Sequence, residues 1–471
     1  MTWIASCPPR RVLGVIACLL LGGCGKDETT KPPPVVVGPE DAGPDASSED
    51  GGGSGGGGSG AAARGGSGGK AGTTGGRGGS GADDDAGTDP NTLDPTEACK
   101  LAEENSRLEL PVKFGTEAGF AIAIGVTGFG VAYDAGECGT IGTLPVASSG
   151  MFAEPMKLLG DCARIQDVSL LRVSDGWRLG WIDNATGSSE LQSALLSDEL
   201  GLHADSTRDR ITNDMLREHA PVGANIAGTP YLAWISEDLT NNQRQISRKR
   251  LDGDGNVEIL LPFDADRRPI SLALAQVGRE NAALAFVTEE GERGVWLQAL
   301  DDSAKRVGDP VLLTEFVTAG NSVDLATREE DGGGVVYSID VEGANHEVRF
   351  RRLDKDGKLL GDEVKVVGSP LQGRDASVAR ISGGYVVAYR QIPISTDDKS
   401  EVRIAFITKE GNVMRDGVGR LLTYAIADAD PNGGRVTVRV SVDGQLLVAF
   451  LNGAGDDNKL VVVRKRLDCT L

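Results

Sequence analysis

The most regular feature of the chain is a short apolar stretch that ends in an aromatic residue and returns about every fifty residues. The stretches read VAY, LGW, LAW, LAF, VVY, VAY and VAF, and their last residues are Tyr133, Trp181, Trp234, Phe286, Tyr337, Tyr389 and Phe450. Successive aromatic residues lie 48, 53, 52, 51, 52 and 61 positions apart. Four of them follow a glycine by five or six positions, at Gly176, Gly332, Gly384 and Gly444. The pattern predicts a structural unit that occurs seven times.

Each unit predicts four strands. In the fifth unit they span residues 323–328, 334–339, 347–353 and 363–367, and an Asp-Gly turn joins the last two. Asp caps its own backbone in such turns, and Gly adopts positive φ. The related stretch LDGDGNVEI at residues 251–259 looks like the start of a calcium loop, yet Val257 and Phe263 replace the required glycine and glutamate. This stretch is therefore predicted to be a turn between strands.

Four antiparallel strands repeated at this period resemble the blades of a β-propeller. The resemblance implies an all-β fold, a seven-bladed β-propeller of four-stranded antiparallel blades, over residues 94–471. Radial stacking covers both faces of each sheet. The seven aromatic residues are therefore expected to pack between neighbouring blades.

The seventh unit ends after three strands, so the ring needs a fourth strand from elsewhere in the chain. Residues 107–114, RLELPVKF, alternate between polar and apolar positions and precede the first unit. We predict that they form the outer strand of the seventh blade and close the ring. Before them, Asp94-Pro95-Thr96-Glu97 is typical of a helix start, which predicts one short helix over residues 95–105.

The N-terminus has the pattern of a targeting segment. Arg10 and Arg11 precede an apolar run at residues 12–21 that is too short to span a bilayer, which predicts a signal peptide over residues 1–23. The run ends in LGGC, which resembles the bacterial lipobox. The resemblance implies a lipoprotein whose Cys24 carries the lipid and holds the chain on a membrane, and Gly25 in place of aspartate implies the outer membrane. The alternative is an ordinary secretory signal with a chance cysteine.

Residues 24–93 are rich in Gly, Ser, Asp and Pro, as in GGGSGGGGSG at residues 51–60. A stretch of this composition cannot bury a core, so it is predicted to be a disordered tether. Random-coil scaling gives about 65 such residues a reach of roughly 45 Å. The folded domain is therefore expected to stand away from the membrane.

Of the seven cysteines, Cys7 and Cys18 lie in the signal peptide and Cys24 is the predicted lipidation site. The other four are Cys99, Cys138, Cys162 and Cys469. An even number in an exported protein predicts disulfides, and three pairings are possible. Ring closure by residues 107–114 brings the first and last of the four together. We therefore predict a Cys99–Cys469 bond and a Cys138–Cys162 bond.

The formal net charge of −21 disfavours binding to nucleic acid and to anionic lipid. The sequence contains no phosphate-binding or dinucleotide-binding glycine motif, and none of its three histidines has a second metal ligand at a suitable spacing. No cofactor is therefore predicted. The domain is expected to be a monomer.

Acidic loops follow the second strand of every unit, and in a propeller such loops share one face with the links between blades. The carboxylates proposed for this rim are Asp183, Glu237, Asp238, Glu289, Asp340, Asp397 and Asp456. Gathered there, they could bind a divalent cation or serve as acid and base on a glycan. The alternative is a solvated loop rim, which is the simpler explanation of the charge.

A second acidic stretch, DADPNGG at residues 428–434, matches the first half of a calcium loop through Asp428, Asp430 and Asn432. Arg439 stands where the loop needs a bidentate glutamate, so the match is incomplete. No metal site is predicted elsewhere.

The sequence favours a non-enzymatic binding or scaffold module, lipid-anchored in the bacterial envelope, whose rim contacts a protein or a glycan. It contains no Gly-x-Ser-x-Gly elbow, and no catalytic residue is assigned. Two alternatives stay open: a carbohydrate-active hydrolase or lyase that uses rim carboxylates, and a purely structural component of the envelope.

Overall fold

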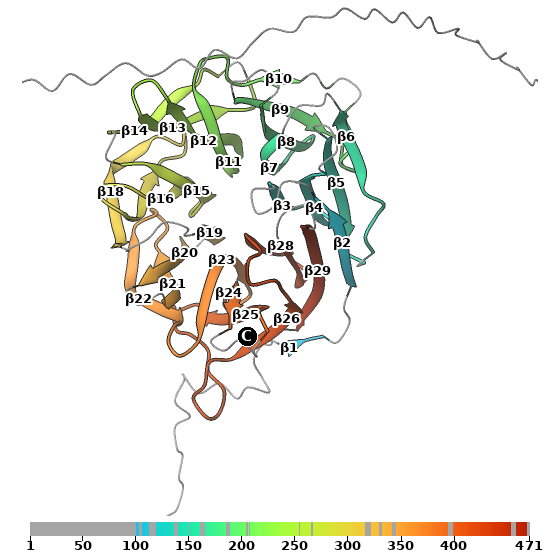
Figure 1. Cartoon of the computed structure of the whole chain (residues 1–471), viewed down its shortest axis with the longest axis vertical. Coiled ribbons are helices and arrows are strands. Elements are labelled where there is room, and N and C mark those ends of the chain that lie inside the picture. Colours follow the sequence, from blue (N-terminus) through green and yellow to red (C-terminus); the bar gives the residue numbers. More distant parts are fainter. Residues whose placement is uncertain are drawn as a thin grey trace, which may run out of the picture. The chain divides into compact units, whose positions relative to one another are not determined.

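The computed structural model describes residues 100–468 except 103–105, 113–118, 136–139, 150, 161–164, 185–188, 204–205, 207, 254, 265–266, 316–321, 329–331, 342–344, 394–398 and 454–457. Every regular element in these residues is a strand, and the strands form seven antiparallel sheets arranged as a ring of blades (Figure 1). The described residues contain no helix that is long and apolar enough to cross a membrane. The predicted signal peptide, the tether, Cys24 and the four cysteines proposed for disulfides lie outside the described residues.

The blades follow one another along the chain. Blade 1 consists of β3 (Phe120–Ile124), β4 (Gly128–Asp134), β5 (Thr140–Ala147) and β6 (Met156–Gly160). Blade 2 consists of β7 (Ile165–Val173), β8 (Gly176–Asp183), β9 (Glu190–Leu196) and β10 (Asp209–Arg210). Blade 3 consists of β11 (Arg217–Ile226), β12 (Thr229–Asp238), β13 (Gln243–Arg250) and β14 (Glu258–Phe263). Blade 4 consists of β15 (Pro269–Gln276), β16 (Ala282–Thr288), β17 (Gly294–Leu300) and β18 (Arg306–Glu315).

The last three blades keep the same order. Blade 5 consists of β19 (Val323–Arg328), β20 (Gly332–Val341), β21 (Asn345–Leu353) and β22 (Leu359–Val367). Blade 6 consists of β23 (Gln372–Ile381), β24 (Gly384–Ile392), β25 (Glu401–Thr408) and β26 (Thr423–Asp428). Blade 7 consists of β27 (Val436–Val440), β28 (Gln445–Asn452), β29 (Lys459–Asp468) and β2 (Ser106–Pro111), and β1 (Lys100–Leu101) also pairs with β29.

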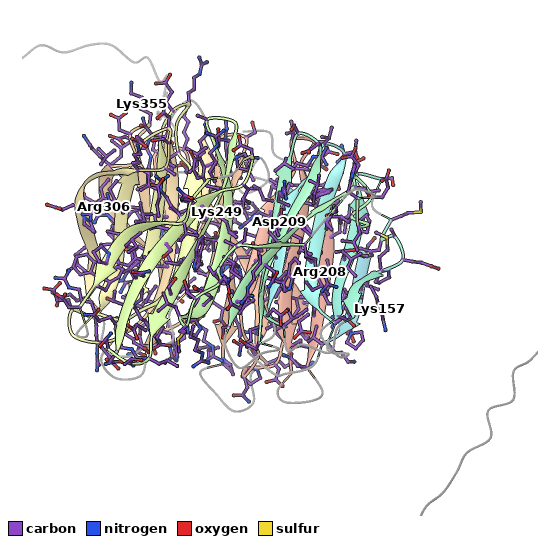
Figure 2. The ribbon with its side chains drawn as sticks, turned by 90° about the horizontal axis from the view of Figure 1, so that it is seen from above. Lys157, Arg208, Asp209, Lys249, Arg306 and Lys355 are labelled. Atoms are coloured by element: carbon purple, nitrogen blue, oxygen red, sulfur yellow. The ribbon has the colours of Figure 1, made fainter. Side chains whose placement is uncertain are left out.

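The first strand of each blade lies innermost and contacts the first strands of the two neighbouring blades. β27 contacts β3 in the same way, so the ring is closed. In the side view, the labelled side chains Lys157, Arg208 and Arg306 lie on the outer wall of the ring (Figure 2). The predicted all-β, seven-bladed fold with four-stranded blades is confirmed.

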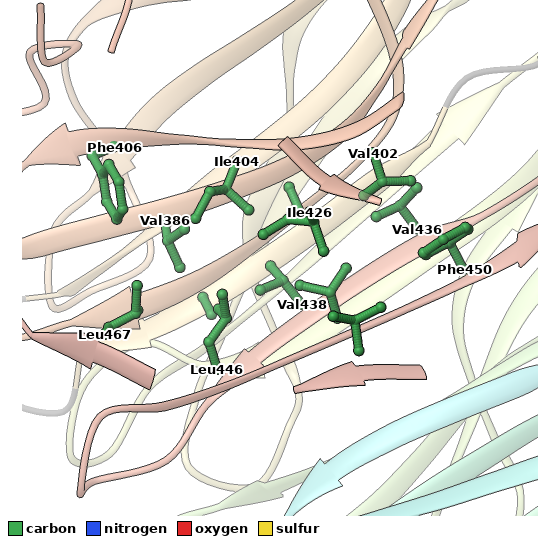
Figure 3. Packing of buried hydrophobic residues seen from close by; sticks show 14 of the residues in the cluster. Val386, Val402, Ile404, Phe406, Ile426, Val436, Val438, Leu446, Phe450 and Leu467 are labelled. Carbon is green, nitrogen blue, oxygen red and sulfur yellow. The ribbon is translucent and has the colours of Figure 1, made fainter. Parts of the chain in front are cut away.

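The seven recurring aromatic residues are all buried, and each lies in the second strand of its blade. The buried apolar side chains of the described residues form seven clusters, each between two neighbouring blades, and each cluster contains one of these aromatic residues. Phe450, for example, belongs to the cluster between blades 6 and 7, where Val402 and Val436 lie beside it (Figure 3). Burying a large aromatic side chain contributes about 1.5–3 kcal/mol relative to exposing it, so the repeated residue holds the blades together.

The glycine that precedes the aromatic residue has a steric role. Gly176 and Gly332 are the first residues of β8 and β20, and both have positive φ, +138° and +103°. A Cβ atom there would lie 2.0 Å from the Leu196 carbonyl oxygen and 2.1 Å from that of Leu353. The third strand of the blade therefore approaches too closely for any side chain.

β2 pairs with β29 along its whole length, from Ser106 opposite Arg464 to Pro111 opposite Lys459. An N-terminal strand thus completes the C-terminal blade, which is the closure that the alternation at residues 107–114 indicates. The helix predicted over residues 95–105 is wrong at Lys100 and Leu101, which pair with Asp468 and Leu467. A helix this short is marginal in water, whereas the open edge of β29 offers ready hydrogen-bond partners.

Candidate functional site

A channel of about 1500 Å³ passes through the ring and is lined by the first strands of all seven blades. Its wall includes residues near the start of these strands, such as Asp167 and Asp375, and residues near their end, such as Gln276 and Arg380. The channel therefore extends along the length of the innermost strands. Side chains from seven separate parts of the sequence converge on it.

Three blades meet in the channel at Asp324 of β19, Ser377 of β23 and Arg439 of β27. Arg439 Nη1 donates to Asp324 Oδ2 at 2.9 Å and to the carbonyl oxygen of Val438 at 2.7 Å. The hydroxyl of Ser377 donates to Asp324 and accepts from the backbone N–H of Val438 at 3.0 Å. These bonds fix the Asp324 carboxylate and the Arg439 guanidinium in place.

Arg435 directly precedes β27 and also lines the channel. Its guanidinium lies 5.3 Å from the centre of the Phe120 ring, which is a cation–π contact with blade 1. The side chain is open to the water of the channel. Burial by the surrounding wall lowers the pKa of Arg435, and the charges of Asp167 and Asp324 oppose that shift. We refer to Asp167, Asp324, Arg435 and Arg439 as the central charged cluster.

Asp375 lines the channel beside this cluster and pairs with a buried arginine. Arg390 is fully buried, and its Nε lies 3.3 Å from Asp375 Oδ2. The remaining nitrogens of Arg390 donate to the carbonyl oxygens of Asp430 at 2.7 Å, Gly434 at 3.1 Å and Leu451 at 2.8 Å, all near or in blade 7. Burial raises the pKa of the Asp375 carboxyl even though Arg390 and Arg374 lower it.

A second charged group, the rim cluster, consists of His219, Glu237, Arg244, Arg268 and Glu289, at the junction of blades 3 and 4. Glu237 accepts from Arg244 Nε at 3.0 Å, from Arg268 Nη2 at 3.0 Å and from His219 Nε2 at 3.1 Å. Burial by itself raises the pKa of Glu237, but these hydrogen bonds outweigh it and lower that pKa to about 2. Burial also lowers the pKa of His219, which is therefore neutral at pH 7 and donates to Glu237.

The structure distributes the carboxylates predicted for the rim among several local roles. Of the five that the structure describes, it brings together only Glu237 and Glu289, through Arg244 and Arg268. Asp238 caps a turn by accepting from the backbone N–H of Thr240 at 2.9 Å. Asp340 forms an ion pair with His346, and Asp183 ends β8 opposite Ile165 and Glu190. Asp397 and Asp456 lie outside the described residues.

The incomplete calcium pattern forms a tight turn. Asp430 Oδ1 accepts from the backbone N–H of Asn432 at 2.7 Å, and the carbonyl oxygen of Asp430 accepts from Arg390. Asp428 is exposed and lies 3.5 Å from Lys399 Nζ. Among the described residues, no group of three His, Cys, Asp or Glu side chains is arranged to hold a metal ion.

The sequence analysis did not single out the central charged cluster or Asp375. One signal was present: an aspartate interrupts the apolar pattern of the first strand in three blades, in QDVSLL (Asp167), VDLAT (Asp324) and RDASVA (Asp375). A charged residue in a strand that lies at the centre of a ring must face the channel or find a partner. Arg435 carries no comparable signal.

The chain matches no protein-family model and no curated protein. Solved structures resemble the chain at low sequence identity. The BP39L lectin from Burkholderia pseudomallei has a TM-score of 0.52 and 12% identity, over 74% of this chain and 96% of the lectin. The α-L-arabinofuranosidase Arb93A from Fusarium graminearum has 0.44 and 14%, over 64% and 93% of the two chains. The GH43 endo-arabinanase from Bacillus licheniformis has 0.34 and 12%, over 53% and 96%. Likeness at this identity shows the fold alone.

The prediction that favoured a non-enzymatic module over an enzyme is withdrawn, because these similarities show the fold alone and the fold gives that preference no support. Arabinanases and an arabinofuranosidase are among the solved structures that resemble this chain. The prediction was wrong because it relied on the absence of a contiguous catalytic motif. In a ring of blades, side chains that act together come from strands about fifty residues apart, so no such motif is required.

Proposed function

We propose that this chain is a lipid-anchored envelope protein that binds a carbohydrate in the central channel of its propeller. The observation that carries the proposal is the lining of the channel: Asp167, Asp324, Asp375, Arg435 and Arg439 converge there from four blades. Sugars are recognised by fixed polar groups in a concave site on a rigid scaffold.

The size and rigidity of the channel support this proposal. Its volume of about 1500 Å³ exceeds the roughly 300–1,000 Å³ of an ordinary small-molecule pocket, so an oligosaccharide fits better than a single sugar. Asp324 and Arg439 are held by hydrogen bonds between blades before any ligand arrives. Groups held in advance lose little conformational entropy when they bind a ligand.

A glycan array tests the proposal. The full chain, purified in detergent, is expected to bind a restricted set of oligosaccharides of three or more sugars, and the heat-denatured chain is expected to bind none. Absence of binding to every glycan on an array that covers bacterial, plant and animal structures would contradict the proposed function.

The anchor is tested separately. Replacement of Cys24 by Ser is expected to abolish incorporation of radiolabelled palmitate and to release the protein from the membrane fraction. Mass spectrometry of the wild-type N-terminus is expected to find a diacylglyceryl cysteine at position 24. An unmodified N-terminus at another residue would show that the anchor is absent, without any bearing on the sugar site.

Glycoside hydrolysis is the second candidate, and the environment of Asp375 favours it. Glycosidases pair a carboxyl group of raised pKa, which protonates the leaving oxygen, with a carboxylate that acts as base or nucleophile. Asp375 has a raised pKa through burial, and Asp324 lies on the neighbouring first strand in an ion pair with Arg439. Asp375 would be the acid and Asp324 the carboxylate.

Reducing-sugar release from each glycan that the array identifies tests this candidate. If the chain hydrolyses its ligand, Asp375→Asn and Asp324→Asn are each expected to lower kcat by 100-fold or more. Asp309→Asn, on the outer strand β18 with its side chain 99% exposed, is the control and is expected to keep full activity. Binding without any sugar release by the wild type would exclude hydrolysis of that glycan and leave the binding site intact.

A further inference from the structure

We propose that the glycan bound in the channel carries a carboxylate, as in a uronic or sialic acid, and that the guanidinium of Arg435 binds this carboxylate. The inference rests on the proposed carbohydrate site and adds to it the chemical class of the ligand. Three features of the described residues lead to it: the partners of each arginine in the channel, the position of Arg435 and the charge around it.

The two arginines of the central charged cluster differ in their partners. Arg439 is satisfied by Asp324 and by the carbonyl oxygen of Val438. The guanidinium of Arg435 has no hydrogen bond and no ion pair within the described part of the chain, and it lies against the face of Phe120. Its five N–H donors are therefore free for a ligand.

At the position of Arg435, an unpaired guanidinium is less stable than at an open surface. Its side chain reaches channel water, but the wall of the ring surrounds it and removes part of the hydration that a guanidinium has at an open surface. A cation in such a place gains more from an anionic partner than an exposed arginine does. A carboxylate matches the planar fork of a guanidinium with two parallel hydrogen bonds.

Phe120 helps to orient the guanidinium of Arg435. The ring centre lies 5.3 Å from the guanidinium carbon, so the arginine is held against blade 1 where it lines the channel. Arg435 itself has a positive φ of 28°, a backbone conformation that differs from the extended one of β27. The chain thus holds an unpaired cation in the channel by two local features.

The overall charge limits the kind of acid that fits. The net charge of −21 repels a polyanion, and Asp167 and Asp324 stand close to the proposed carboxylate site. At physiological ionic strength, exposed charges farther away than about 8 Å are largely screened, so the local field at Arg435 is set by its near neighbours Asp167, Asp324 and Arg439. A short glycan with one carboxylate at the point that enters the channel fits this balance better than a densely charged polymer.

Matched sugar pairs test the inference by calorimetric titration of the full chain. One pair is a trisaccharide with a single terminal uronic acid and its carboxyl-reduced form, and the other is 3′-sialyllactose and lactose. At least one acidic member is expected to bind ten times or more tighter than its neutral counterpart. The pair that shows the difference identifies the acid, uronic or sialic, that supplies the carboxylate.

Variants of the protein locate the effect. Arg435→Gln is expected to remove the preference for the acidic member and to leave binding of the neutral member unchanged. Arg435→Lys is expected to keep part of the preference for the acidic member, because lysine keeps the charge but loses the bidentate geometry. Arg306→Gln is the matched control, because Arg306 lies on the outer wall of the ring and is not among the residues that line the channel. This variant is expected to behave as the wild type.

The outcomes separate the inference from the proposed function. If neutral and acidic members bind equally, the carboxylate inference is overturned while the carbohydrate site stands. If neither pair binds and the array is also empty, both fail. If Arg435→Gln does not fold, as judged by its circular dichroism, the comparison of acidic and reduced sugars on the wild type still decides the inference.

Discussion

Glu218 is a carboxyl group fully buried between blades 2 and 3, where Ser236 Oγ donates to it at 2.8 Å. Burial raises its pKa from 4.5 to about 8, and the nearby charges of Asp214 and Glu190 act in the same direction. The folded protein therefore holds a proton here at neutral pH, which the unfolded chain releases. A single residue of this kind makes the stability of the ring depend on pH.

The direction of that dependence follows from proton binding. Between about pH 4.5 and pH 8 the folded state binds more protons at Glu218 than the unfolded state, so the contribution of Glu218 to stability falls as pH rises. Glu218→Gln is expected to be more stable than the wild type at pH 8, by up to several kcal/mol, and similar to it at pH 4.5. Urea unfolding at both pH values measures the difference.

Glu199→Gln, at an exposed position, is the control and is expected to unfold as the wild type at both pH values. Equal stability of Glu218→Gln and the wild type at pH 8 would show that the carboxyl group is charged and accommodated in the folded ring.

At the scale of elements, the seven junctions between blades are unequal. The cluster between blades 2 and 3 has six buried apolar residues, whereas the one between blades 6 and 7 has seventeen. Polar contacts add to the smaller apolar cluster between blades 2 and 3. Arg210 pairs with Glu190 at 2.6 Å, and Thr212 donates to the same carboxylate at 3.1 Å. Blade 2 also has the shortest outer strand, β10, with two residues.

This junction is expected to open before the others. Hydrogen exchange of native protein should show faster exchange in β9 and β11 than in β24 and β28, because local opening follows the amount of buried apolar contact. Mass spectrometry of deuterated peptides reports it strand by strand. Uniform protection around the ring would contradict the ranking of the junctions.

The strand pairings extend toward the predicted disulfides. Lys100 pairs with Asp468, and Cys99 and Cys469 are their neighbours in the sequence. Thr140 pairs with Gly160, and Cys138 and Cys162 are each two positions away in the sequence. The four cysteines lie outside the described residues, and both bonds stay predictions.

Peptide mapping without reduction is expected to find Cys99 joined to Cys469 and Cys138 joined to Cys162. The first bond closes a loop of several hundred residues and contributes about 5 kcal/mol in the chain-entropy model. Cys469→Ser is expected to lower the melting temperature more than Cys162→Ser, because the second loop is far shorter. A peptide that joins Cys99 to Cys138 or Cys162 would refute the assignment.

The blades could be predicted from sequence because their cores repeat. An aromatic residue and a glycine return at one spacing, and each has the same physical role in every blade. The channel could not be predicted in this way. Bulges shift the register within β7, β11 and β23, near Asp167, His219 and Asp375, so simple alternation does not tell which side chains face inward.

The loops misled the sequence analysis for a related reason. Acidic residues after each second strand were expected to converge on one rim, but most of those described cap turns or pair with basic neighbours in their own blade. Glu237 shows the effect most clearly, since three donors already use its carboxylate. Sequence shows where charges occur and not which of them are neutralised by a partner.

At the scale of the whole molecule, β2 and β29 close the ring, and closure is what makes the channel. Seven first strands surround one space, and each contributes a few side chains to its wall. The channel is therefore a property of the complete propeller, and no blade could provide it alone.

A pair of tryptophan substitutions in blade 4 tests most directly whether the carbohydrate binds in this channel. Ser271→Trp places a large side chain in the channel wall, whereas Val311→Trp places the same side chain on the outer strand, at a valine that is 48% exposed. Calorimetric titration with the tightest glycan from the array is expected to show at least a tenfold weaker Kd for Ser271→Trp and an unchanged Kd for Val311→Trp. Wild-type affinity in a folded Ser271→Trp variant would contradict the channel as the binding site.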